Sequence, residues 1–393
     1  MRCATLIRAP ATAYDMASFR IKCSECGREY PPNAALWRCE CGRPLDVHLD
    51  LSDVDVSRHT FAGRPCTMWR YGELLPSLGG SVVSLGEGMT PVVEASVGGA
   101  SVTYKLDYVM PTGSFKDRGA SVSLTRAKWL GLRAVVEDSS GNAGAAIAAY
   151  SSAAGIACKV FVPRDAPEGK VLQIRSYGAE VVRVEGSRAE VNAAALREAE
   201  RSGAHYIGHL WDPFFIEGIK TLAYEAAEQV GWRGFDAVVV PVGSGGLLLG
   251  VWKGFRELAE LGLIDSPPRV YGVQAVSCAP VYELLHGARV GACEREPLAD
   301  GIAVPNPPRG PQVARAVKEA GGDIVLVEDG DIVAALRELA KMGLFVEPTS
   351  ATALAALRKL IESGQVDRGE SVLLPLTGFG LKALDKLIKR RLL

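Results

Sequence analysis

The sequence has little excess of either charge and no long apolar run. Lysine and arginine number 44 against 45 aspartates and glutamates, which gives a formal net charge of −1. This balance gives no reason to expect nucleic acid or an anionic membrane as a partner. No apolar run reaches the roughly 18 residues of a membrane span, and residues 1–20 lack the apolar core of a secretion signal. We therefore expect a cytoplasmic protein.

Repeats, low-complexity tracts and long linkers are also missing. With 393 residues, the chain is long enough for two domains and an appendage. Its nine cysteines are too few for a disulfide scaffold in a chain of this size, but four of them cluster near the amino end.

The cysteine cluster consists of Cys23-x2-Cys26 and, twelve residues later, Cys39-x-Cys41. Two close pairs on glycine-containing turns are typical of a tetrahedral thiolate site for zinc. All four ligands would come from the protein, so the metal would have a structural role and would stabilise a segment too short to bury its own core. The alternative is a ribbon that keeps four reduced thiols and no longer binds metal.

Beyond residue 130, predicted strands and helices alternate. We expect strands at 135–138, 159–162, 180–184 and 205–208, and after residue 218 at 237–242, 270–275, 324–327 and 372–376. Helices are expected between them. This order predicts an α/β fold with two interleaved open twisted sheets flanked by helices, whose ligands bind at the carboxyl ends of the strands.

The stretch 111–119, Pro-Thr-Gly-Ser-Phe-Lys-Asp-Arg-Gly, contains the first candidate catalytic residue. Ser114 is predicted to be the N-cap of a helix that runs to about Leu130. Lys116 would then lie in the first turn, where the helix dipole disfavours an ammonium and lowers its pKa. A lowered pKa suits a lysine that forms a Schiff base. The alternative is an ordinary surface lysine.

Two glycine-containing loops each follow a predicted strand and open a helix. The first is Ser139–Gly144, which includes Asn142, and the second is Gly243, Ser244, Gly245, Gly246 and Leu247. The second loop offers backbone amides and no bulky side chains at a helix start, which suits a phosphate group. A tight turn is the alternative. Leu248 stands where a dinucleotide-binding loop would have its third glycine.

These three stretches, in this order, resemble the fold-type II pyridoxal-phosphate enzymes, and most closely the threonine synthases. The resemblance extends from the cysteine ribbon to the carboxyl terminus and includes Leu85–Pro91 and Glu347–Ala351. It implies an extension (1–20), a ribbon (21–65), a large cofactor-binding domain (66–110 and 216–393) and a small domain (111–215). It also implies a homodimer.

The resemblance assigns a role to each candidate residue. Lys116 would hold pyridoxal phosphate covalently, Asn142 would donate to its 3′-oxygen, and Gly243–Leu247 would bind its phosphate. Thr377, before Gly378, would contact the pyridine nitrogen, which a neutral hydroxyl cannot keep protonated. Without the resemblance, a helix cap near Asn142 and a turn at Thr377 explain these residues equally well.

The implied activity is the conversion of O-phospho-L-homoserine and water to L-threonine and phosphate, a lyase reaction of threonine biosynthesis. Lys116 would act as general base and acid. Two positions depart from the threonine synthase pattern: Ala143 replaces the usual threonine, and Phe215 replaces an arginine that helps to hold the substrate's phosphate. Substitute cations near the motifs in sequence are Lys105, Arg118, Arg164 and Lys220.

Other activities remain open. Gly243–Leu247 and Ala299–Val304 are closer to the threonine and serine ammonia-lyases, and a cysteate or cysteine synthase would use the same cofactor for β-replacement. A different class is a zinc-ribbon protein that binds nucleic acid or another protein and has an inactive α/β part. The near-neutral charge and the few basic residues around the ribbon argue against that class.

Overall fold

A computed structural model of the chain describes residues 16–291, 293, 297–390 and 392, so most of the expected extension lies outside the described residues. The chain divides into two compact units, each made of two stretches that alternate along the sequence. The first unit extends to Met89 and resumes over Lys116–Gly218. The second takes Thr90–Phe115 and the chain from Ile219 onward. The expected α/β fold with interleaved segments is therefore confirmed.

The first unit contains a parallel four-stranded sheet in the order β8-β7-β6-β9. Its strands are β6 (Ala134–Glu137), β7 (Ala157–Pro163), β8 (Glu180–Val184) and β9 (His205–Tyr206). Its helices are α1 (Lys116–Trp129), α2 (Asn142–Ala154), α3 (Glu168–Ser176), α4 (Arg188–Ser202) and α5 (Pro213–Ile219). Small side chains on α2, such as Ala145 and Ala148, share one buried cluster with Val160 and Val162 of β7. Their size brings the helix close to the sheet.

The cysteine ribbon is a three-stranded antiparallel sheet in the first unit. It consists of β1 (Phe19–Cys23), β2 (Glu29–Tyr30) and β3 (Leu45–Leu49), in the order β2-β1-β3. Alternate residues of β1 are buried, as expected for a sheet with one covered face. The ring of Phe19 packs edge-to-face on Phe214 of α5, with 5.5 Å between centroids. The ribbon therefore shares a core with the helices of its unit.

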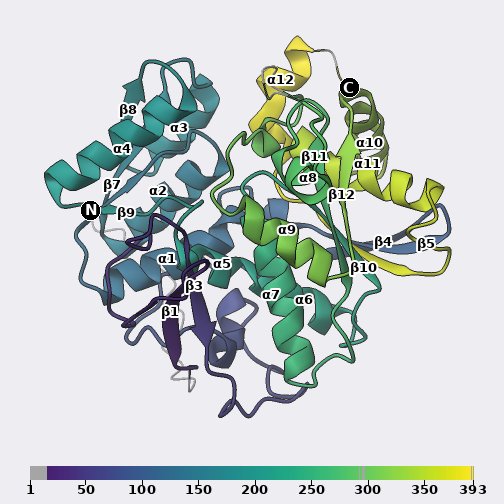
Figure 1. Cartoon of the computed structure of the whole chain (residues 1–393), viewed down its shortest axis with the longest axis horizontal. Coiled ribbons are helices and arrows are strands. Elements are labelled where there is room, and N and C mark those ends of the chain that lie inside the picture. Colours follow the sequence, from purple (N-terminus) through teal and green to yellow (C-terminus); the bar gives the residue numbers. More distant parts are fainter. Residues whose placement is uncertain (1–15, 292, 294–296, 391, 393) are drawn as a thin grey trace. The chain divides into compact units, whose positions relative to one another are not determined.

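The second unit contains a six-stranded sheet in the order β12-β11-β10-β13-β5-β4, in which all neighbours are parallel except β5 and β4. Its strands are β4 (Val92–Val97), β5 (Ala100–Lys105), β10 (Ala237–Pro241), β11 (Arg269–Ala275), β12 (Ile324–Val327) and β13 (Ser371–Pro375). Figure 1 shows the blue β4 and β5 beside green and yellow segments, because the early hairpin joins strands from the later half of the chain.

Helices connect the strands of this second sheet. They are α6 (Thr221–Gln229), α7 (Gly246–Glu260), α8 (Pro280–His286), α9 (Gly310–Glu319), α10 (Asp329–Lys341), α11 (Pro348–Glu362) and α12 (Leu384–Lys389). The apolar faces of α10 and α11 pack with β5, β10, β11 and β13 in one large buried cluster. No helix in the described part of the chain is long and apolar enough to cross a membrane.

The alternation of strands and helices matches the prediction from sequence at most elements, and β8 has the predicted bounds. The sequence reading missed β4, α8 and α9. The prediction that Ser114 caps a helix is wrong, because α1 begins two residues later, at Lys116. Ser114 instead forms an isolated bridge with Gly378, and its buried hydroxyl makes no hydrogen bond within the described chain.

Candidate active site

Lys116 is the first residue of α1. Burial around its amine lowers its pKa to about 8, although the nearby carboxyl of Glu137 acts in the opposite direction. Its Nζ atom lies 5.6 Å from the ring centroid of Phe215. The lowered pKa expected from sequence is therefore present, but burial is its main cause, whereas the sequence argument relied on the helix dipole. An amine with this pKa is a far better nucleophile at neutral pH than an ordinary lysine.

A hydrogen-bonded pair, Glu137 and His209, lies near this amine. Nδ1 of His209 is 2.8 Å from Oε1 of Glu137, and the His209 amide donates to the other carboxyl oxygen at 3.2 Å. Burial lowers the pKa of His209 well below its usual range, and the charges of Lys116 and Arg188 act in the same direction. Burial also raises the pKa of Glu137. Sequence reasoning missed this pair because 72 positions separate its members.

Phe215 fills the position where the threonine synthase pattern has arginine. Its side chain is buried, with 1% of its surface exposed. The ring covers Gly119 of α1 so closely that a Cβ atom on Gly119 would lie 2.3 Å from Cδ1 of Phe215. The ring centroid of His209 lies 5.9 Å from that of Phe215. The structure therefore places an apolar ring, and no cation, at this position.

The four substitute cations suggested by the sequence are placed as follows. Lys105 and Lys220 are fully buried and pair with Glu225 and Glu257 respectively, each at 2.9 Å. Arg118 is fully buried, and Arg164 forms an exposed ion pair with Glu185. The sequence reading missed a fifth cation, Arg188 at the start of α4. Its side chain is 46% exposed, and it pairs with Asp138, next to Glu137, at 2.9 Å.

Glu87 organises the first unit around α1 and α2. Its carboxylate is buried and accepts five hydrogen bonds, from Trp69 Nε1 (3.1 Å), Ser121 Oγ (2.6 Å), Ser84 Oγ (3.1 Å), the Leu85 amide (2.8 Å) and Tyr150 OH (2.8 Å). Burial nevertheless raises its pKa. In the sequence, this residue stood out only as part of Leu85–Pro91, one of the stretches that carry the family resemblance. Its donors on α1 and α2 belong to the helices that begin with Lys116 and Asn142.

Asn142 is the first residue of α2, and the loop before it is tight. A Cβ atom on Gly144 would lie 1.9 Å from the carbonyl oxygen of Ser139, so only glycine fits there. The Ser139 hydroxyl accepts from the Gly141 amide at 3.2 Å, which explains one serine of this loop as a turn residue. Ala143 is buried and brings no hydroxyl to the position.

The second glycine loop joins β10 to α7 in the second unit. A Cβ atom on Gly243 would lie 2.8 Å from the carbonyl oxygen of Gly301. Gly245 has φ +90°, and a Cβ atom there would lie 2.1 Å from Cγ2 of Val313. Both positions therefore require glycine, so the loop brings no side chains of its own at these positions before the 15-residue helix α7. This cradle fits the phosphate of a cofactor.

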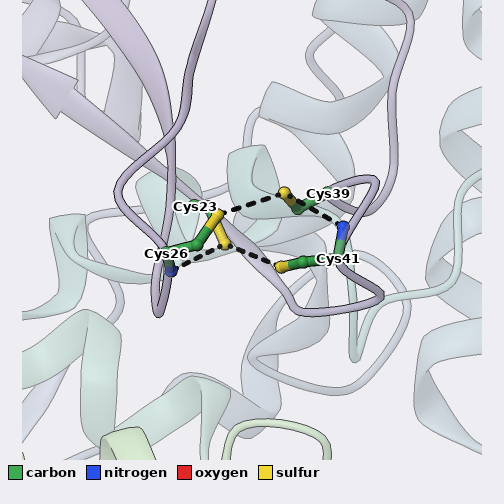
Figure 2. Close-up of side chains that lie close together, drawn as sticks. All are labelled: Cys23, Cys26, Cys39 and Cys41. Atoms are coloured by element: carbon green, nitrogen blue, oxygen red, sulfur yellow. Dashed lines mark hydrogen bonds between the residues drawn. The ribbon is translucent and has the colours of Figure 1, made fainter.

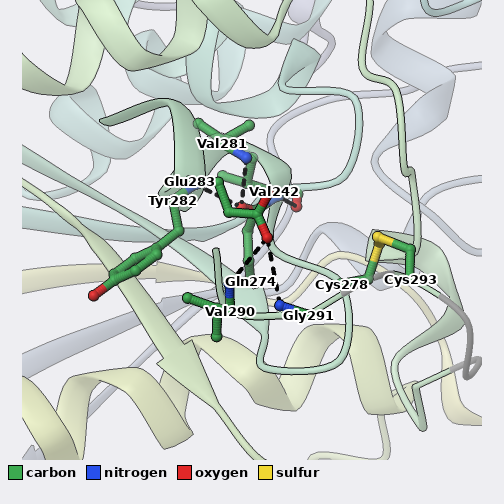
Figure 3. Close-up of a disulfide and its surroundings, with 9 residues drawn as sticks. All are labelled: Val242, Gln274, Cys278, Val281, Tyr282, Glu283, Val290, Gly291 and Cys293. Carbon is green, nitrogen blue, oxygen red and sulfur yellow. Dashed lines mark hydrogen bonds between the residues drawn. A yellow bond between two sulfur atoms is a disulfide. The ribbon is translucent and has the colours of Figure 1, made fainter. Parts of the chain in front are cut away.

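Gln274 holds the residue before this loop, and a disulfide lies further along the same chain (Figure 3). Nε2 of Gln274 donates to the carbonyl of Val242 at 3.3 Å, and Oε1 of Gln274 accepts from the amides of Val281 and Tyr282 at 3.0 Å each. A disulfide with an S–S distance of 2.08 Å joins Cys278, just before α8, to Cys293, which follows that helix. The sequence reading did not predict this pair, because the two cysteines stand in no recognisable spacing motif.

Thr377 follows β13 in the second unit and is 3% exposed. Its hydroxyl lies 2.9 Å from the hydroxyl of Ser350 on α11. Its carbonyl accepts from the amide of Phe115, the residue before Lys116, at 3.0 Å. Lys116 and Asn142 thus belong to the first unit, and the glycine loop and Thr377 to the second, and each is held within its own unit.

The four ribbon cysteines come together (Figure 2). All four sulfur atoms lie within 4.8 Å of one another, with Cys23–Cys41 at 3.5 Å and Cys26–Cys39 at 3.7 Å. Four thiolates about 2.3 Å from a tetrahedral zinc are about 3.8 Å apart, so the cluster has the right size. Burial favours the neutral thiol of Cys39, but hydrogen bonds, first from the Tyr30 hydroxyl, outweigh it and lower its pKa to about 6.

Comparison with known proteins identifies the family. Residues 83–378 match the family model described as pyridoxal-phosphate dependent enzyme. The chain belongs to this family. Within the second unit, the glycine cradle and the Thr377 hydroxyl offer uncharged donors that suit the phosphate and the ring of such a cofactor. Within the first unit, Lys116 offers an amine with a lowered pKa. In pyridoxal-phosphate-dependent enzymes, the cofactor performs the covalent chemistry and the protein binds and orients it.

Relatives in this pyridoxal-phosphate-dependent family cover nearly the whole chain. A threonine synthase of Methanocaldococcus jannaschii is 36% identical over 94% of this chain and 94% of its own length. A threonine synthase of Methanosarcina acetivorans is 34% identical over 93% of this chain and 92% of its own. Among solved structures, threonine deaminase isoform 2 of Solanum lycopersicum superposes with a TM-score of 0.66 at 26% identity, over 77% of this chain and 82% of that chain.

Proposed function

We propose that the protein is a threonine synthase that converts O-phospho-L-homoserine and water to L-threonine and phosphate in threonine biosynthesis. The observation that carries the proposal is the similarity to threonine synthases over the full length, at 36% identity and 94% coverage in both directions. The test is an assay of purified protein with amino acids and phospho-amino acids, in which phosphate, ammonia and keto acid are all measured. Phosphate and threonine from phosphohomoserine are expected.

The cofactor of this reaction is pyridoxal phosphate, and its residues are proposed as follows. Lys116 would hold the cofactor covalently through its aldehyde carbon, and Asn142 would donate to its 3′-oxygen. The backbone amides of Gly243–Leu247 would donate to its phosphate, and Thr377 would contact its ring nitrogen. When bound, the cofactor withdraws electrons from the substrate and stabilises negative charge on its carbon atoms. The buried, neutral Thr377 hydroxyl supplies no charge that would hold a proton on the ring nitrogen.

Lys116 moves the protons of the reaction. As a neutral amine it removes a proton from Cα of the substrate and then one from Cβ. As an ammonium it supplies a proton to Cγ, the carbon that phosphate leaves and that becomes the methyl group, and it returns the proton to Cα once water has added at Cβ. Phosphate leaves from Cγ, and the oxygen of water becomes bonded to Cβ. The amine's pKa of about 8 suits both roles, because either form is readily populated near neutral pH.

A threonine or serine ammonia-lyase is the second candidate, and a β-replacement enzyme of the cysteate or cysteine synthase type is the third. The observation that favours an ammonia-lyase is the apolar Phe215 at the position of the phosphate-binding arginine. Ammonia and keto acid from threonine or serine, without phosphate from phosphohomoserine, would replace the synthase assignment. A sulfur-containing product from a serine derivative would support β-replacement.

Substitution Phe215→Arg tests how the substrate's phosphate is bound. A charge-assisted contact contributes about 1.5–3 kcal/mol, so the variant should bind phosphohomoserine about ten- to a hundred-fold more tightly if no other cation serves. The measurement is KM for phosphohomoserine. Phe215→Leu is the control, since it opens space without adding charge and should not lower KM.

Weaker binding of phosphohomoserine by Phe215→Arg would point to another cation that already binds the phosphate. If Phe215→Arg binds the substrate more weakly, another cation already occupies that role and is repelled by the new one. Arg188 is the candidate because it is partly exposed and acts electrostatically on His209, as Lys116 does. Arg188→Gln should then raise KM for phosphohomoserine by about ten- to a hundred-fold. No change in either variant would contradict a phosphorylated substrate.

The ribbon is proposed to bind one structural zinc through Cys23, Cys26, Cys39 and Cys41. Elemental analysis should find about one zinc per chain, and the double substitution Cys39→Ser, Cys41→Ser should remove it. The variant should also unfold at lower temperature, because the ribbon packs on Phe214 through Phe19. Cys66→Ser, an exposed cysteine outside the cluster, is the matched control. A metal-free wild type with full thermal stability would favour the ribbon that has lost its metal.

The family resemblance also supports a cytoplasmic homodimer with a small-molecule substrate and no nucleic-acid or membrane partner. Light scattering on the purified protein measures the oligomeric state directly. A monomer at working concentration would contradict the dimer.

A further inference from the structure

Ser350 makes an unusual set of contacts with the segment after β13. It is the third residue of α11 and is fully buried. Its Oγ atom lies 3.0 Å from the amide nitrogen of Thr377 and 2.9 Å from that of Gly378. The same atom lies 2.9 Å from Oγ1 of Thr377 and 3.3 Å from the carbonyl oxygen of Gly378. Four polar atoms therefore surround one hydroxyl.

The direction of each hydrogen bond follows from the chemistry of the groups. A serine hydroxyl has two acceptor lone pairs and one proton. Backbone amides can only donate, so the amides of Thr377 and Gly378 occupy both lone pairs of Ser350. The Thr377 hydroxyl therefore cannot donate to Ser350, and the Ser350 proton is donated outward. Two acceptors are within reach of this proton, the Thr377 hydroxyl oxygen at 2.9 Å and the Gly378 carbonyl oxygen at 3.3 Å. Because the first is closer, Ser350 donates to the Thr377 oxygen.

The proton of Thr377 is consequently directed away from Ser350. In the described part of the chain, the Thr377 hydroxyl makes no other hydrogen bond than this one. The backbone of Thr377 is also held, since its amide donates to Ser350 and its carbonyl accepts from Phe115. With the main chain fixed, Ser350 determines the direction in which the hydroxyl proton of Thr377 points.

We propose that Ser350 is a positioning residue that fixes the hydroxyl of Thr377 as a hydrogen-bond donor to the unprotonated ring nitrogen of the cofactor. This inference rests on the proposed function, in which Thr377 contacts that nitrogen. A threonine hydroxyl on its own can donate or accept. If it accepted, the ring nitrogen would have to carry a proton. Because Ser350 donates its proton to the Thr377 oxygen, the Thr377 hydroxyl is left as a donor to the ring nitrogen. Ser350 thereby favours an unprotonated ring nitrogen without contacting the cofactor.

The experiment follows the ring nitrogen directly. The protein is reconstituted with pyridoxal phosphate carrying an isotope-labelled ring nitrogen, and its NMR chemical shift is compared among wild type, Thr377→Val, Ser350→Ala and Ser350→Cys. Thr377→Val removes the donor and should shift the signal. Ser350→Ala should shift it in the same direction, and Ser350→Cys, which keeps the shape with a weaker donor, should shift it less. The loss of one oriented neutral hydrogen bond should lower kcat about three- to ten-fold.

Thr352→Ala is the matched control, because this buried hydroxyl on the same helix donates only to the carbonyl of Thr349, at 2.7 Å. It should keep the wild-type shift. Unchanged shifts in both Ser350 variants, with a changed shift in Thr377→Val, would overturn the role of Ser350 and leave the proposed function intact. An unchanged shift in Thr377→Val would instead remove Thr377 from the cofactor site. It would overturn both the role of Ser350 and the proposed contact between Thr377 and the ring nitrogen. If Ser350→Ala does not fold, Ser350→Cys decides the outcome.

Discussion

The substitution Lys116→Ala is expected to abolish turnover and covalent attachment of the cofactor, while the protein still folds. Removing a group that serves both as nucleophile and as proton carrier should lower kcat about a thousandfold or more. The measurements are the rate of phosphate release and the visible absorption of the protein-bound cofactor. Lys128→Ala, at the exposed end of the same helix, is the matched control and should keep both.

The pH dependence of cofactor loading gives this prediction a specific signature. Covalent attachment needs the neutral amine, and burial lowers the pKa of Lys116 to about 8. At pH 7 about one amine in ten is then neutral, against about one in several thousand for an ordinary lysine. The loading rate of cofactor-free protein should rise with pH and level off above about pH 8. A rate that keeps rising toward pH 10, or borohydride labelling of another lysine, would contradict the assignment.

The substitution Glu87→Ala should be the most destabilising change in the first unit. It removes the acceptor of Tyr150 and one acceptor of Trp69, both of which lie in the interior. Trp69 keeps the Ser121 hydroxyl as an acceptor at 2.9 Å, whereas Tyr150 is left without one. A buried donor without a partner costs about 1–3 kcal/mol, so a loss of up to about 3 kcal/mol in unfolding free energy is expected. Urea denaturation measures this loss. Glu200→Ala, an exposed carboxylate on α4, should change stability by less than about 0.5 kcal/mol.

The effect of Glu87 should also depend on pH. Burial raises its pKa in the folded state above the value in the unfolded chain. Between these two values the folded protein holds the extra proton, so the stability contributed by Glu87 is greatest at low pH and declines as pH rises through the window. The difference between wild type and Glu87→Ala should therefore shrink with rising pH. A difference that grows with pH would mean that the five hydrogen bonds outweigh burial.

Local signals in the sequence were sufficient for much of the fold and for the local geometry around several candidate residues. The run of valines before Gly243 predicted a strand, and the glycines after it predicted a loop that opens a helix. The structure has this strand, loop and helix, and two of the loop positions have no room for a side chain. The clustering of the four ribbon cysteines likewise followed from their spacing. In each case the pattern lies within a few dozen neighbouring residues.

Contacts between distant residues were beyond the sequence reading. Ser350 lies 27 positions from Thr377, and Glu87 lies 63 from Tyr150, so nothing in the local pattern connects them. Ser114 shows how a local rule can fail, because a serine just before a helix normally caps it. Here the bridge between Ser114 and Gly378 takes the serine out of the capping position. Tertiary pairing decides such cases, and a single sequence does not contain it explicitly.

The position of β13 between β10 and β5 has a consequence for folding during synthesis. The hairpin β4–β5 leaves the ribosome early, but the strand that pairs with the other edge of β5 begins only at Ser371. At usual rates of synthesis this edge remains unpaired for a time on the order of tens of seconds. The first unit, whose last segment ends at Gly218, can fold during that interval. The nascent second unit is therefore the part of this protein that most needs a chaperone to cover an open strand edge.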